Sequence, residues 1–314
     1  MAGISGDERK WLKSLLGRSV VFDEPMSLHT SFKVGGPADA LATPESEEIL
    51  VELVRGLRQR DCRYLVVGGG TNLLVKDSGI RKVVILLKKI AKDIRFDSKR
   101  RAVVADAGKG LNALCGFALK NGLAGMNFAL GIPGSVGGAV AMNAGTAIGA
   151  VEDILREVEV LFSDGRVSTV KKESLGFSYR KLVWESDPEN EEKSAPIILK
   201  ASFDLTPDDP KKLKKSAADI VRRRKQRQPS WLSSAGCFFK NPPGSRPAGM
   251  LIDLAGLKGK AVGGAEISER HANFILNRKN ATASDILCLK ELVQETIKNK
   301  FDIDLEPEVK IVGD

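Results

Sequence analysis

The stretch GIPGSVGGAVAMNAG, residues 131–145, carries the strongest clue to the fold. Five of its fifteen residues are glycine and none is charged, so Ser135 and Asn143 supply its strong side-chain hydrogen-bonding groups. Bare main chain can lie close against a flat ring and direct its amides at ring heteroatoms. A long apolar loop of this kind is more often functional than idle. We therefore predict that residues 131–145 form one wall of a ligand site.

A second glycine-rich stretch, residues 68–72 (GGGTN), follows a short apolar strand predicted at 64–67. A dinucleotide-binding fingerprint needs a third glycine and the start of a helix, but Leu73 stands at that position and 72–75 reads as extended chain. No Gly-Lys-Ser/Thr follows, so a P-loop is excluded as well. Two interpretations stay open from these residues: a tight turn between strands, or bare amides that approach a diphosphate.

The composition is that of an ordinary globular protein of about two domains. The chain has 314 residues, of which 42% are hydrophobic and 28% charged. We find no apolar run near the ~18 residues of a membrane span and no signal-peptide core, so we expect a cytoplasmic protein without a membrane partner. Four cysteines form no C-x-x-C pair, and the only histidines are His29 and His271. We therefore expect free thiols and no metal site.

The net charge of +9 is concentrated in residues 211–229, which carry nine cations and one anion. Such a run can bind nucleic acid, bind a phosphorylated small molecule, or form the solvated face of a helix. No aromatic residue interrupts it, as a stacking platform for single strands would require. We expect no obligate nucleic-acid partner.

Short strands alternate with helices without regular βαβ spacing, which indicates the α+β class. Thr43 and Pro44 predict the N-cap and first position of one helix. Another helix spans 111–121 and ends at Gly122. Further helices are predicted after Pro210, at 248–255 and at 284–300. Strands are predicted at 83–87, 102–105, 197–205 and 305–312, with a hairpin over 154–170 that turns at Asp164-Gly165.

Taken together, the motifs resemble a known family. TSFKVGGP (30–37), VVGGGTNLLV (66–75), GIPGSVGG (131–138) and NAG (143–145) resemble the FAD-binding fold of the vanillyl-alcohol-oxidase or PCMH type. FSYR (177–180), AGCFFKNP (235–242) and LEPEVK (305–310) narrow the match to the UDP-N-acetylmuramate dehydrogenases, also called UDP-N-acetylenolpyruvoylglucosamine reductases. The short stretch between Arg180 and Cys237 is similar to the family's second type, which lacks an inserted tyrosine loop.

The resemblance implies a domain plan. Residues 1–26 would be a lead-in. Residues 27–205 would form the FAD-binding domain, in two subdomains split near residue 76. Residues 206–314 would form a C-terminal α+β domain that binds substrate.

The resemblance also implies the ligands. FAD would be the cofactor and NADPH the co-substrate, and a monomer would reduce UDP-N-acetylglucosamine enolpyruvate during peptidoglycan precursor synthesis. The implied FAD-binding residues are Gly68, Gly69, Gly70, Thr71, Asn72, Pro133, Gly134, Ser135, Gly137, Asn143 and Gly145.

Three residues match the family's catalytic positions. Arg180 would hold the substrate carboxylate, because a guanidinium offers a planar fork. Glu308 would stabilise the enolate formed there, with its pKa raised by burial. Cys237 stands where most members carry serine and would donate the proton. We interpret the other three cysteines as core residues.

Four residues match substrate-binding positions: Tyr179, Arg227, Asn241 and Lys310. Lys310 replaces the more common arginine, so a bidentate contact would be lost there. Lys240 would border the site, whereas His271 matches it only loosely and reads better as a structural residue.

Two rival functions remain. Another flavoenzyme of the same fold, acting on a small hydroxyacid or sugar, would keep 66–75 and 131–145 without needing Arg180, Cys237 and Glu308 together. A basic nucleic-acid-binding protein would rely on 211–229.

Overall fold

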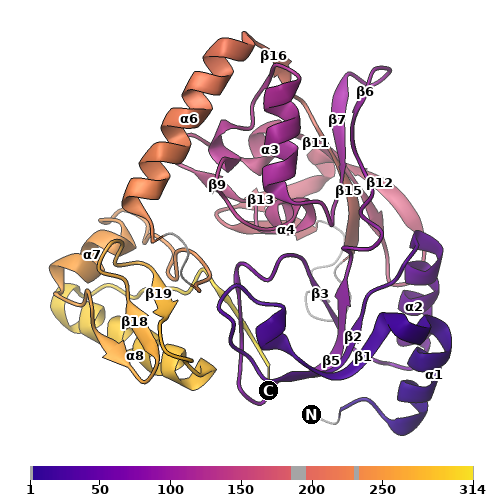
Figure 1. Ribbon diagram of the computed structural model, residues 1–314, viewed down its shortest axis with the longest axis horizontal. Helices are drawn as coiled ribbons and strands as arrows, with labels where there is room; N and C mark the ends of the chain where they lie inside the picture. The colour runs from indigo at the N-terminus through magenta and orange to yellow at the C-terminus, as the bar shows by residue number, and fades with distance from the viewer. Residues whose placement is uncertain (1–2, 185–195, 230–232, 314) are drawn as a thin grey trace.

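The computed structural model describes residues 3–184, 196–229 and 233–313. Two β-sheets and a C-terminal group of small elements make up the molecule (Figure 1). The described residues form three hydrophobic cores. Two of them lie on the two faces of the first sheet, and the larger of these two continues into the second sheet. The third lies inside the C-terminal group. The α+β class predicted from the sequence is confirmed.

The first sheet has the strand order β1-β2-β5-β3. Its strands are β1 (Val20–Pro25), β2 (Pro37–Ala42), β5 (Ile80–Leu86) and β3 (Tyr64–Val67), and β5 runs parallel to both of its neighbours. Side chains of a strand alternate between faces, so Val83 and Ile85 enter one core while Val84 and Leu86 enter the other. A strand buried on both faces needs this continuous apolar run.

The helices α1 (Gly6–Leu16) and α2 (Glu47–Gln59) add Leu12 and Leu53 to the larger core beside this sheet. The segment 1–26 is therefore not a mere lead-in, because its described part supplies a helix and an edge strand. The predicted split near residue 76 is also wrong, because β5 lies beyond it and is an inner strand of the first sheet.

The start of α2 differs from the prediction. Ser46, not Thr43, is the N-cap, and its side chain accepts a hydrogen bond from the Ile49 amide. Thr43 is buried, and its own amide donates to the Ser19 carbonyl at 2.7 Å. This bond extends the β1–β2 pairing, in which Val20 lies opposite Ala42, by one residue. Thr43 therefore still continues the strand, and the helix begins after the next hydroxyl, Ser46.

The second sheet is antiparallel, in the order β12-β11-β15-β7-β6. Its strands are β6 (Ile94–Asp97), β7 (Ala102–Asp106), β11 (Leu155–Leu161), β12 (Val167–Lys171) and β15 (Ile197–Phe203). The predicted hairpin is confirmed in β11 and β12. The helices α3 (Leu111–Lys120), α4 (Val136–Ala141) and α5 (Val151–Ile154) accompany this sheet. Because α4 lies within 131–145, this stretch is not one continuous loop.

Smaller strands complete this half of the molecule. They pair as β8 (Leu123–Ala124) with β16 (Thr206–Pro207), β9 (Gly145–Thr146) with β10 (Gly149–Ala150), and β13 (Leu175–Ser178) with β14 (Lys181–Trp184).

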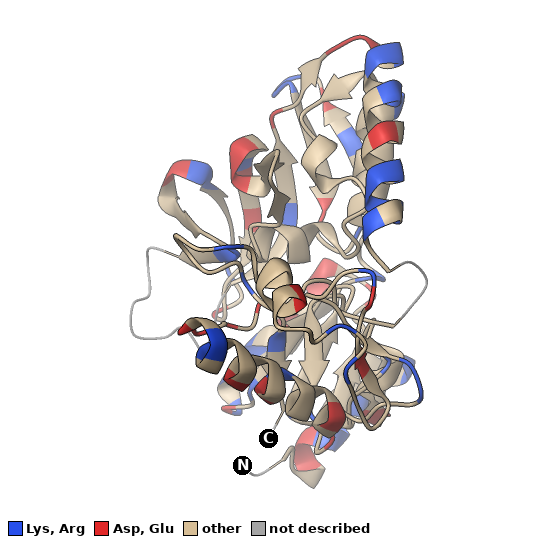
Figure 2. Cartoon of the chain, turned by 90° about the vertical axis from the view of Figure 1, so that its left-hand side faces the viewer, with Lys and Arg blue, Asp and Glu red and all other residues tan. Residues whose placement is uncertain are grey.

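The basic helix α6 (Pro210–Arg227) packs against the second sheet's helices rather than against the C-terminal group. It contacts α3, and its Ala217 belongs to the large core. Figure 2 shows its basic residues as blue bands along the length of the helix, and most of them are exposed. The boundary predicted near residue 206 therefore falls later, after α6, where the C-terminal core begins with Ala235.

The C-terminal group contains α7 (Ala248–Leu254), the sheet β17-β18-β19 (Ala261–Val262, Ala265–Ile267, Ile275–Asn277) and α8 (Ala283–Phe301). The last strand, β20 (Lys310–Val312), leaves this group and pairs in parallel with β4 (Leu73–Val75) of the N-terminal half. Asp77 strengthens the junction by accepting hydrogen bonds from the amides of Ala283 and Ser284 at 2.8 and 2.9 Å. The strand predicted over 305–312 is thus confined to its end.

No helix in the described ranges is long and apolar enough to cross a bilayer.

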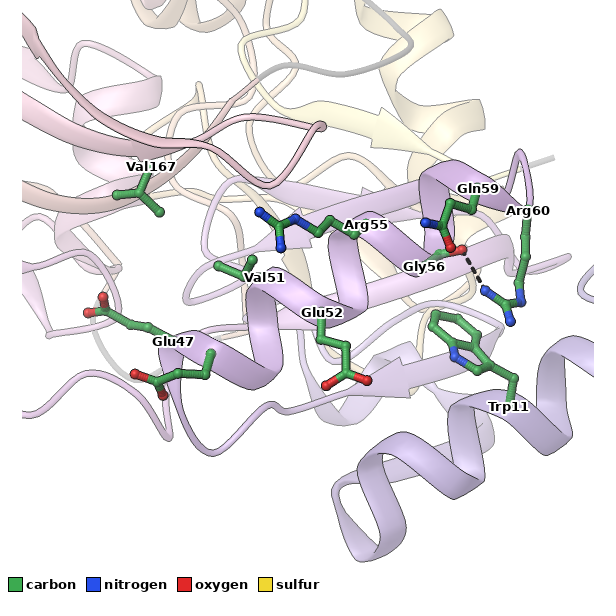
Figure 3. Close-up of a pocket in the computed structure, with 10 residues that line it drawn as sticks. Trp11, Glu47, Val51, Glu52, Arg55, Gly56, Gln59, Arg60 and Val167 are labelled. Carbon is green, nitrogen blue, oxygen red and sulfur yellow. Dashed lines mark hydrogen bonds between the residues drawn. The ribbon is translucent and has the colours of Figure 1, made fainter.

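A shallow surface pocket lies beside α2 (Figure 3). Gly56 lets the Trp11 ring approach, since a Cβ at residue 56 would lie 2.1 Å from the indole. Arg60 stacks over the same ring at 4.1 Å and donates to the Gly56 carbonyl at 3.1 Å. Arg55 donates to the carbonyls of the Asp164-Gly165 turn, which ties the two sheets together. The pocket is thus a packing feature between subdomains.

Gly56→Ala tests this packing. Alanine favours a helix, yet its methyl group would overlap Trp11, so we expect a loss of about 1–3 kcal/mol in the free energy of unfolding. Gly116→Ala is the matched control, because a Cβ there in α3 meets nothing within 4 Å. It should gain about 0.5–1 kcal/mol. Urea unfolding measures both, and equal gains would contradict the contact.

Candidate active site

One cavity of about 730 Å³ lies where the two sheets and the C-terminal group meet. Nearly all of the residues predicted for the site line it, and they come from five separate stretches of chain. The lining residues among those predicted are Gly68, Gly69, Gly70, Thr71, Asn72, Pro133, Gly134, Ser135, Asn143, Gly145, Tyr179, Arg180, Cys237, Asn241, Glu308 and Lys310. Gly137, Arg227, Lys240 and His271 do not line it.

The two glycine-rich stretches form one wall of this cavity. A Cβ on Gly68 would lie 2.2 Å from the Ser135 hydroxyl, so the two segments touch as bare chain. Ser135 caps α4 by accepting from the Gly138 amide at 3.2 Å, and the Thr71 hydroxyl donates to the Pro133 carbonyl at 3.2 Å. The two stretches therefore form a continuous surface of main chain.

Gly137 serves packing instead of the cavity. Its amide donates to the Ala107 carbonyl at 2.8 Å, and a Cβ there would lie 2.8 Å from the Ala107 methyl group. This glycine lets α4 approach the chain that follows β7. The spacing of glycines in the sequence does not show on which side of α4 each one falls.

Asn143 lines the cavity and also holds neighbouring chain in place. It is buried with a left-handed φ of +40°, and its amide donates to the Ser178 carbonyl at 3.2 Å and to Glu152 at 3.0 Å. Its side chain thus holds the β13–β14 hairpin against the cavity wall.

Arg180 stands at the tip of that hairpin. Tyr179 and Arg180 form its two-residue turn, and Arg180 adopts a left-handed φ of +62°. Such a conformation is costly for a residue with a side chain and tends to occur at functional sites. The Arg180 Nε donates to a Glu308 carboxylate oxygen at 2.8 Å. The guanidinium also lies 4.9 Å from the ring centre of Tyr179, which is half exposed.

Glu308 is held by two other segments of chain. Its amide donates to the Phe238 carbonyl at 2.7 Å, and its carbonyl accepts from the Asn72 side chain at 3.1 Å. Burial raises the pKa of the Glu308 carboxyl, because desolvation disfavours its charged form, while the Arg180 cation opposes that rise. The strand pairing of β4 with β20 therefore delivers a carboxyl group with a raised pKa to the glycine-rich wall.

Cys237 faces the same cavity from the segment that pairs with Glu308. Burial raises the pKa of its thiol to about 12, and the negative charge of Glu308 adds to the rise, whereas Arg180 and Arg224 oppose it. The thiol therefore carries its proton at neutral pH.

Asn273 holds this segment in place and was not predicted. Its amide donates to the Phe239 carbonyl at 2.8 Å, and its side-chain oxygen accepts from the Phe239 amide at 2.9 Å. It is buried and lines the cavity. An isolated asparagine 34 residues from its partner has no signal in a single sequence.

The remaining predicted residues lie at the rim or outside it. Asn241 accepts a hydrogen bond from the Ala248 amide at 3.0 Å and so caps α7, and Lys310 is exposed at the rim. Arg227 is exposed near the end of α6 and does not line the cavity, although Arg224 and Gln228 do. Lys240 pairs with Glu306 at 3.0 Å.

His271 packs edge-to-face with Phe274, with ring centres 4.9 Å apart, which agrees with the structural role favoured for it. Of the cysteines interpreted as core, Cys115 is buried, but Cys288 is exposed, so that prediction is wrong for Cys288. Cys62 is partly buried, and its thiol donates to Glu8. Within the described ranges we find no group of three or more His, Cys, Asp or Glu side chains arranged to hold a metal ion.

Two family models match the chain. An FAD-binding domain matches residues 38–171, and the C-terminal domain of UDP-N-acetylenolpyruvoylglucosamine reductase matches residues 228–312. The first match covers the glycine-rich wall, and the second covers Cys237 and Glu308. The chain is therefore an FAD-binding oxidoreductase of the PCMH type with a second domain that completes its cavity.

Whole-chain relatives narrow the class. A UDP-N-acetylenolpyruvoylglucosamine reductase from Desulfosudis oleivorans is 49% identical over 97% of this chain and 98% of its own length. One from Caldanaerobacter subterraneus is 42% identical over 96% and 97%. The crystal structure of the enzyme from Thermus caldophilus superposes with a TM-score of 0.78 at 38% identity, covering 94% of this chain and 98% of that one. The chain belongs to the UDP-N-acetylenolpyruvoylglucosamine reductase family.

The cavity fits a flavin cofactor. Its volume lies in the ~300–1,000 Å³ range of cofactor sites. Its wall at 68–70 and 134–138 is main chain that a ring can approach closely, since a Cβ on Gly68 would already meet a neighbouring atom. In the described part of the chain, the buried Nε of Arg224 lacks a partner and borders the same space.

Glu308→Gln tests the raised carboxyl pKa. The folded protein holds the Glu308 proton above pH 4.5, where the unfolded chain has begun to release it. The stability of the wild type relative to Glu308→Gln should therefore be constant below pH 4.5 and fall as pH rises through the folded-state pKa. Urea unfolding at a series of pH values measures the difference. Glu306→Gln, whose side chain is exposed, is the control. A stability difference that grows with pH in favour of the wild type would contradict the assignment.

Proposed function

We propose that this protein reduces the enolpyruvyl ether of UDP-N-acetylglucosamine to UDP-N-acetylmuramate with NADPH, a step of peptidoglycan precursor synthesis. The observation that carries the proposal is that Arg180, Cys237 and Glu308 line one cavity although 57 and 71 residues separate them (237 − 180 and 308 − 237). The hairpin tip, the segment at 237–239 and the segment before β20 each supply one of the three.

The glycine-rich wall would hold FAD, with bare chain against the ring system and amides available to its phosphates. When bound, FAD supplies hydride transfer, which lets electrons from NADPH reach the substrate. Asn72 connects this wall to the Glu308 main chain, so the cofactor wall and the reacting groups are positioned together.

The alkene of an enolpyruvyl ether is conjugated to a carboxylate. Hydride addition to its terminal carbon therefore moves negative charge onto that carboxylate. Arg180 would bind these oxygens, and Glu308, with its raised pKa, can share a proton with them. Such electrostatic groups are worth about 10²–10³ in rate each.

Cys237 would complete the reaction by donating the thiol proton to the carbon next to the carboxylate. Its Sγ becomes a thiolate as the C–H bond forms and regains a proton from solvent. The cations of Arg180 and Arg224 favour that thiolate, and burial keeps the thiol protonated between turnovers. A hydroxyl is a still weaker acid, so sulfur can take the place of the family's serine.

The sugar nucleotide would extend over the rim residues Tyr179, Asn241 and Lys310. A lysine at 310 offers a point charge instead of a bidentate fork. Arg227 would reach the substrate only from the end of α6, outside the cavity. We further propose that the protein is cytoplasmic, and that it works as a monomer because one chain supplies all of the residues proposed here for the site.

The absorbance spectrum of the purified protein tests the proposal. A yellow protein whose flavin absorbance is lost on addition of NADPH and returns with the enolpyruvyl sugar nucleotide is the expected result. If NADPH reduces the flavin, but only a hydroxyacid or sugar and not the enolpyruvyl sugar nucleotide changes its absorbance, the protein has another flavoenzyme activity. A colourless protein would overturn the proposal.

Substitution of Cys237 separates the two half-reactions. Cys237→Ala should leave flavin reduction by NADPH nearly unchanged and slow reoxidation by substrate about 10²–10⁴-fold, because only the second step needs the proton. Stopped-flow absorbance measures both rates. Cys237→Ser is the control and should keep substantial activity. An equal loss in both half-reactions would contradict the role of the thiol.

A further inference from the structure

One cation of α6 differs from the rest of the basic run. The neighbours of Arg224, namely Arg222, Arg223 and Lys225, are exposed, whereas Arg224 is largely covered and lines the cavity. It lies in the last turn of α6, beside Gly131 at the start of the glycine-rich wall. Arg222, Arg223 and Lys225 are thus solvated, whereas the Arg224 side chain borders the cavity.

The environment of this guanidinium is incomplete. Its Nε is buried without a hydrogen-bond partner among the described residues, and the same residues offer it no ion pair. One terminal nitrogen makes a long contact of 3.4 Å to the Gly131 carbonyl. Gly131 leaves room for the group, because a Cβ at that position would lie 3.2 Å from the Arg224 Nε.

A covered, unpaired guanidinium destabilises a protein unless an anion meets it. Burial lowers the pKa of Arg224, which reflects this cost. Arg180 shows the contrast, because its Nε already binds Glu308 at 2.8 Å. The fold therefore leaves the Nε of this covered cation without a partner among the described residues, at the place where the glycine-rich wall meets Cys237.

We propose that Arg224 is an oxyanion-binding residue of this cavity, which receives a phosphate or carboxylate oxygen of the bound cofactor or sugar nucleotide. The inference rests on the proposed function for the identity of those ligands. It assigns to Arg224 the ligand contact for which the motif had suggested Arg227, because the side chain of Arg224, not that of Arg227, borders the cavity.

Three variants test this role. Arg224→Met removes the charge and keeps an unbranched stem, and Arg224→Lys restores a charge without the fork. Lys225→Met is the matched control, since it removes an exposed charge from the next position of the same helix. The readouts on the purified flavoprotein are the dissociation constant of FAD, that of UDP, that of UDP-N-acetylmuramate, and the dependence of each on salt.

We expect Arg224→Met to weaken at least one of these ligands by about 10–100-fold, as loss of a charge-assisted hydrogen bond would. Its binding should also become less sensitive to salt, because one charge contact is gone. Arg224→Lys should recover part of the affinity, and Lys225→Met should bind like the wild type. A merely structural residue would change neither the salt dependence nor the response to lysine.

The probes identify the source of the anion. Weakened FAD binding alone assigns the contact to the cofactor, weakened UDP binding assigns it to the diphosphate of the sugar nucleotide, and a loss confined to UDP-N-acetylmuramate assigns it to the substrate carboxylate. If Arg224→Met binds all three as Lys225→Met does, the inference is overturned. If the wild type binds FAD but reduces no enolpyruvyl substrate, the proposed reaction is contradicted. The effect of Arg224→Met on FAD binding would then still decide whether Arg224 binds an anionic oxygen of the cofactor.

Discussion

The parallel pairing of β4 with β20 is the constraint on which the site depends. It joins a three-residue strand that directly follows the glycine-rich stretch at 68–72 to the last strand of the chain. Because Glu308 lies two residues before β20 and Asn72 lies one residue before β4, the pairing brings them together, and the Asn72 side chain bonds the Glu308 carbonyl. The Lys310 amide donates back to the Asn72 carbonyl at 3.1 Å. A buried carboxyl group with a raised pKa, from the C-terminal part of the chain, thus reaches the wall formed near the N-terminus.

The cavity buries few charged groups, and these groups differ in whether they have a partner of opposite charge. Arg180 and Glu308 form a pair, yet burial still raises the pKa of the carboxyl, so desolvation outweighs the single contact. Cys237 is covered beside them and keeps its proton. Arg224 is a covered cation whose buried Nε has no partner among the described residues. A ligand with anionic oxygens would complete this set, which is why an FAD-dependent reductase of a sugar nucleotide suits the geometry.

The local structure was largely predictable, and the errors have specific causes. Repeating apolar patterns correctly identified the helices around 111–120, 210–227 and 284–301 and the hairpin of β11 and β12. The start of α2 was misplaced because the buried contact of Thr43 with Ser19 is tertiary. The boundary was predicted near residue 206, where Pro207 and Pro210 interrupt the chain, but Ala217 packs α6 onto the FAD-binding half.

The sequence by itself determined which residue types occur and that two stretches are nearly free of side chains, and its short motifs match the family positions of Arg180, Cys237 and Glu308. Short motifs encode these features because each depends on residues that are adjacent in the chain. Only the tertiary structure decided that Gly137 packs on Ala107, that Asn143 and Asn273 hold segments of chain in place, and that Arg224 faces the cavity while Arg227 faces solvent. Those outcomes depend on which side of a helix or turn contacts a segment that is distant in the sequence. The local sequence pattern does not predict such tertiary contacts.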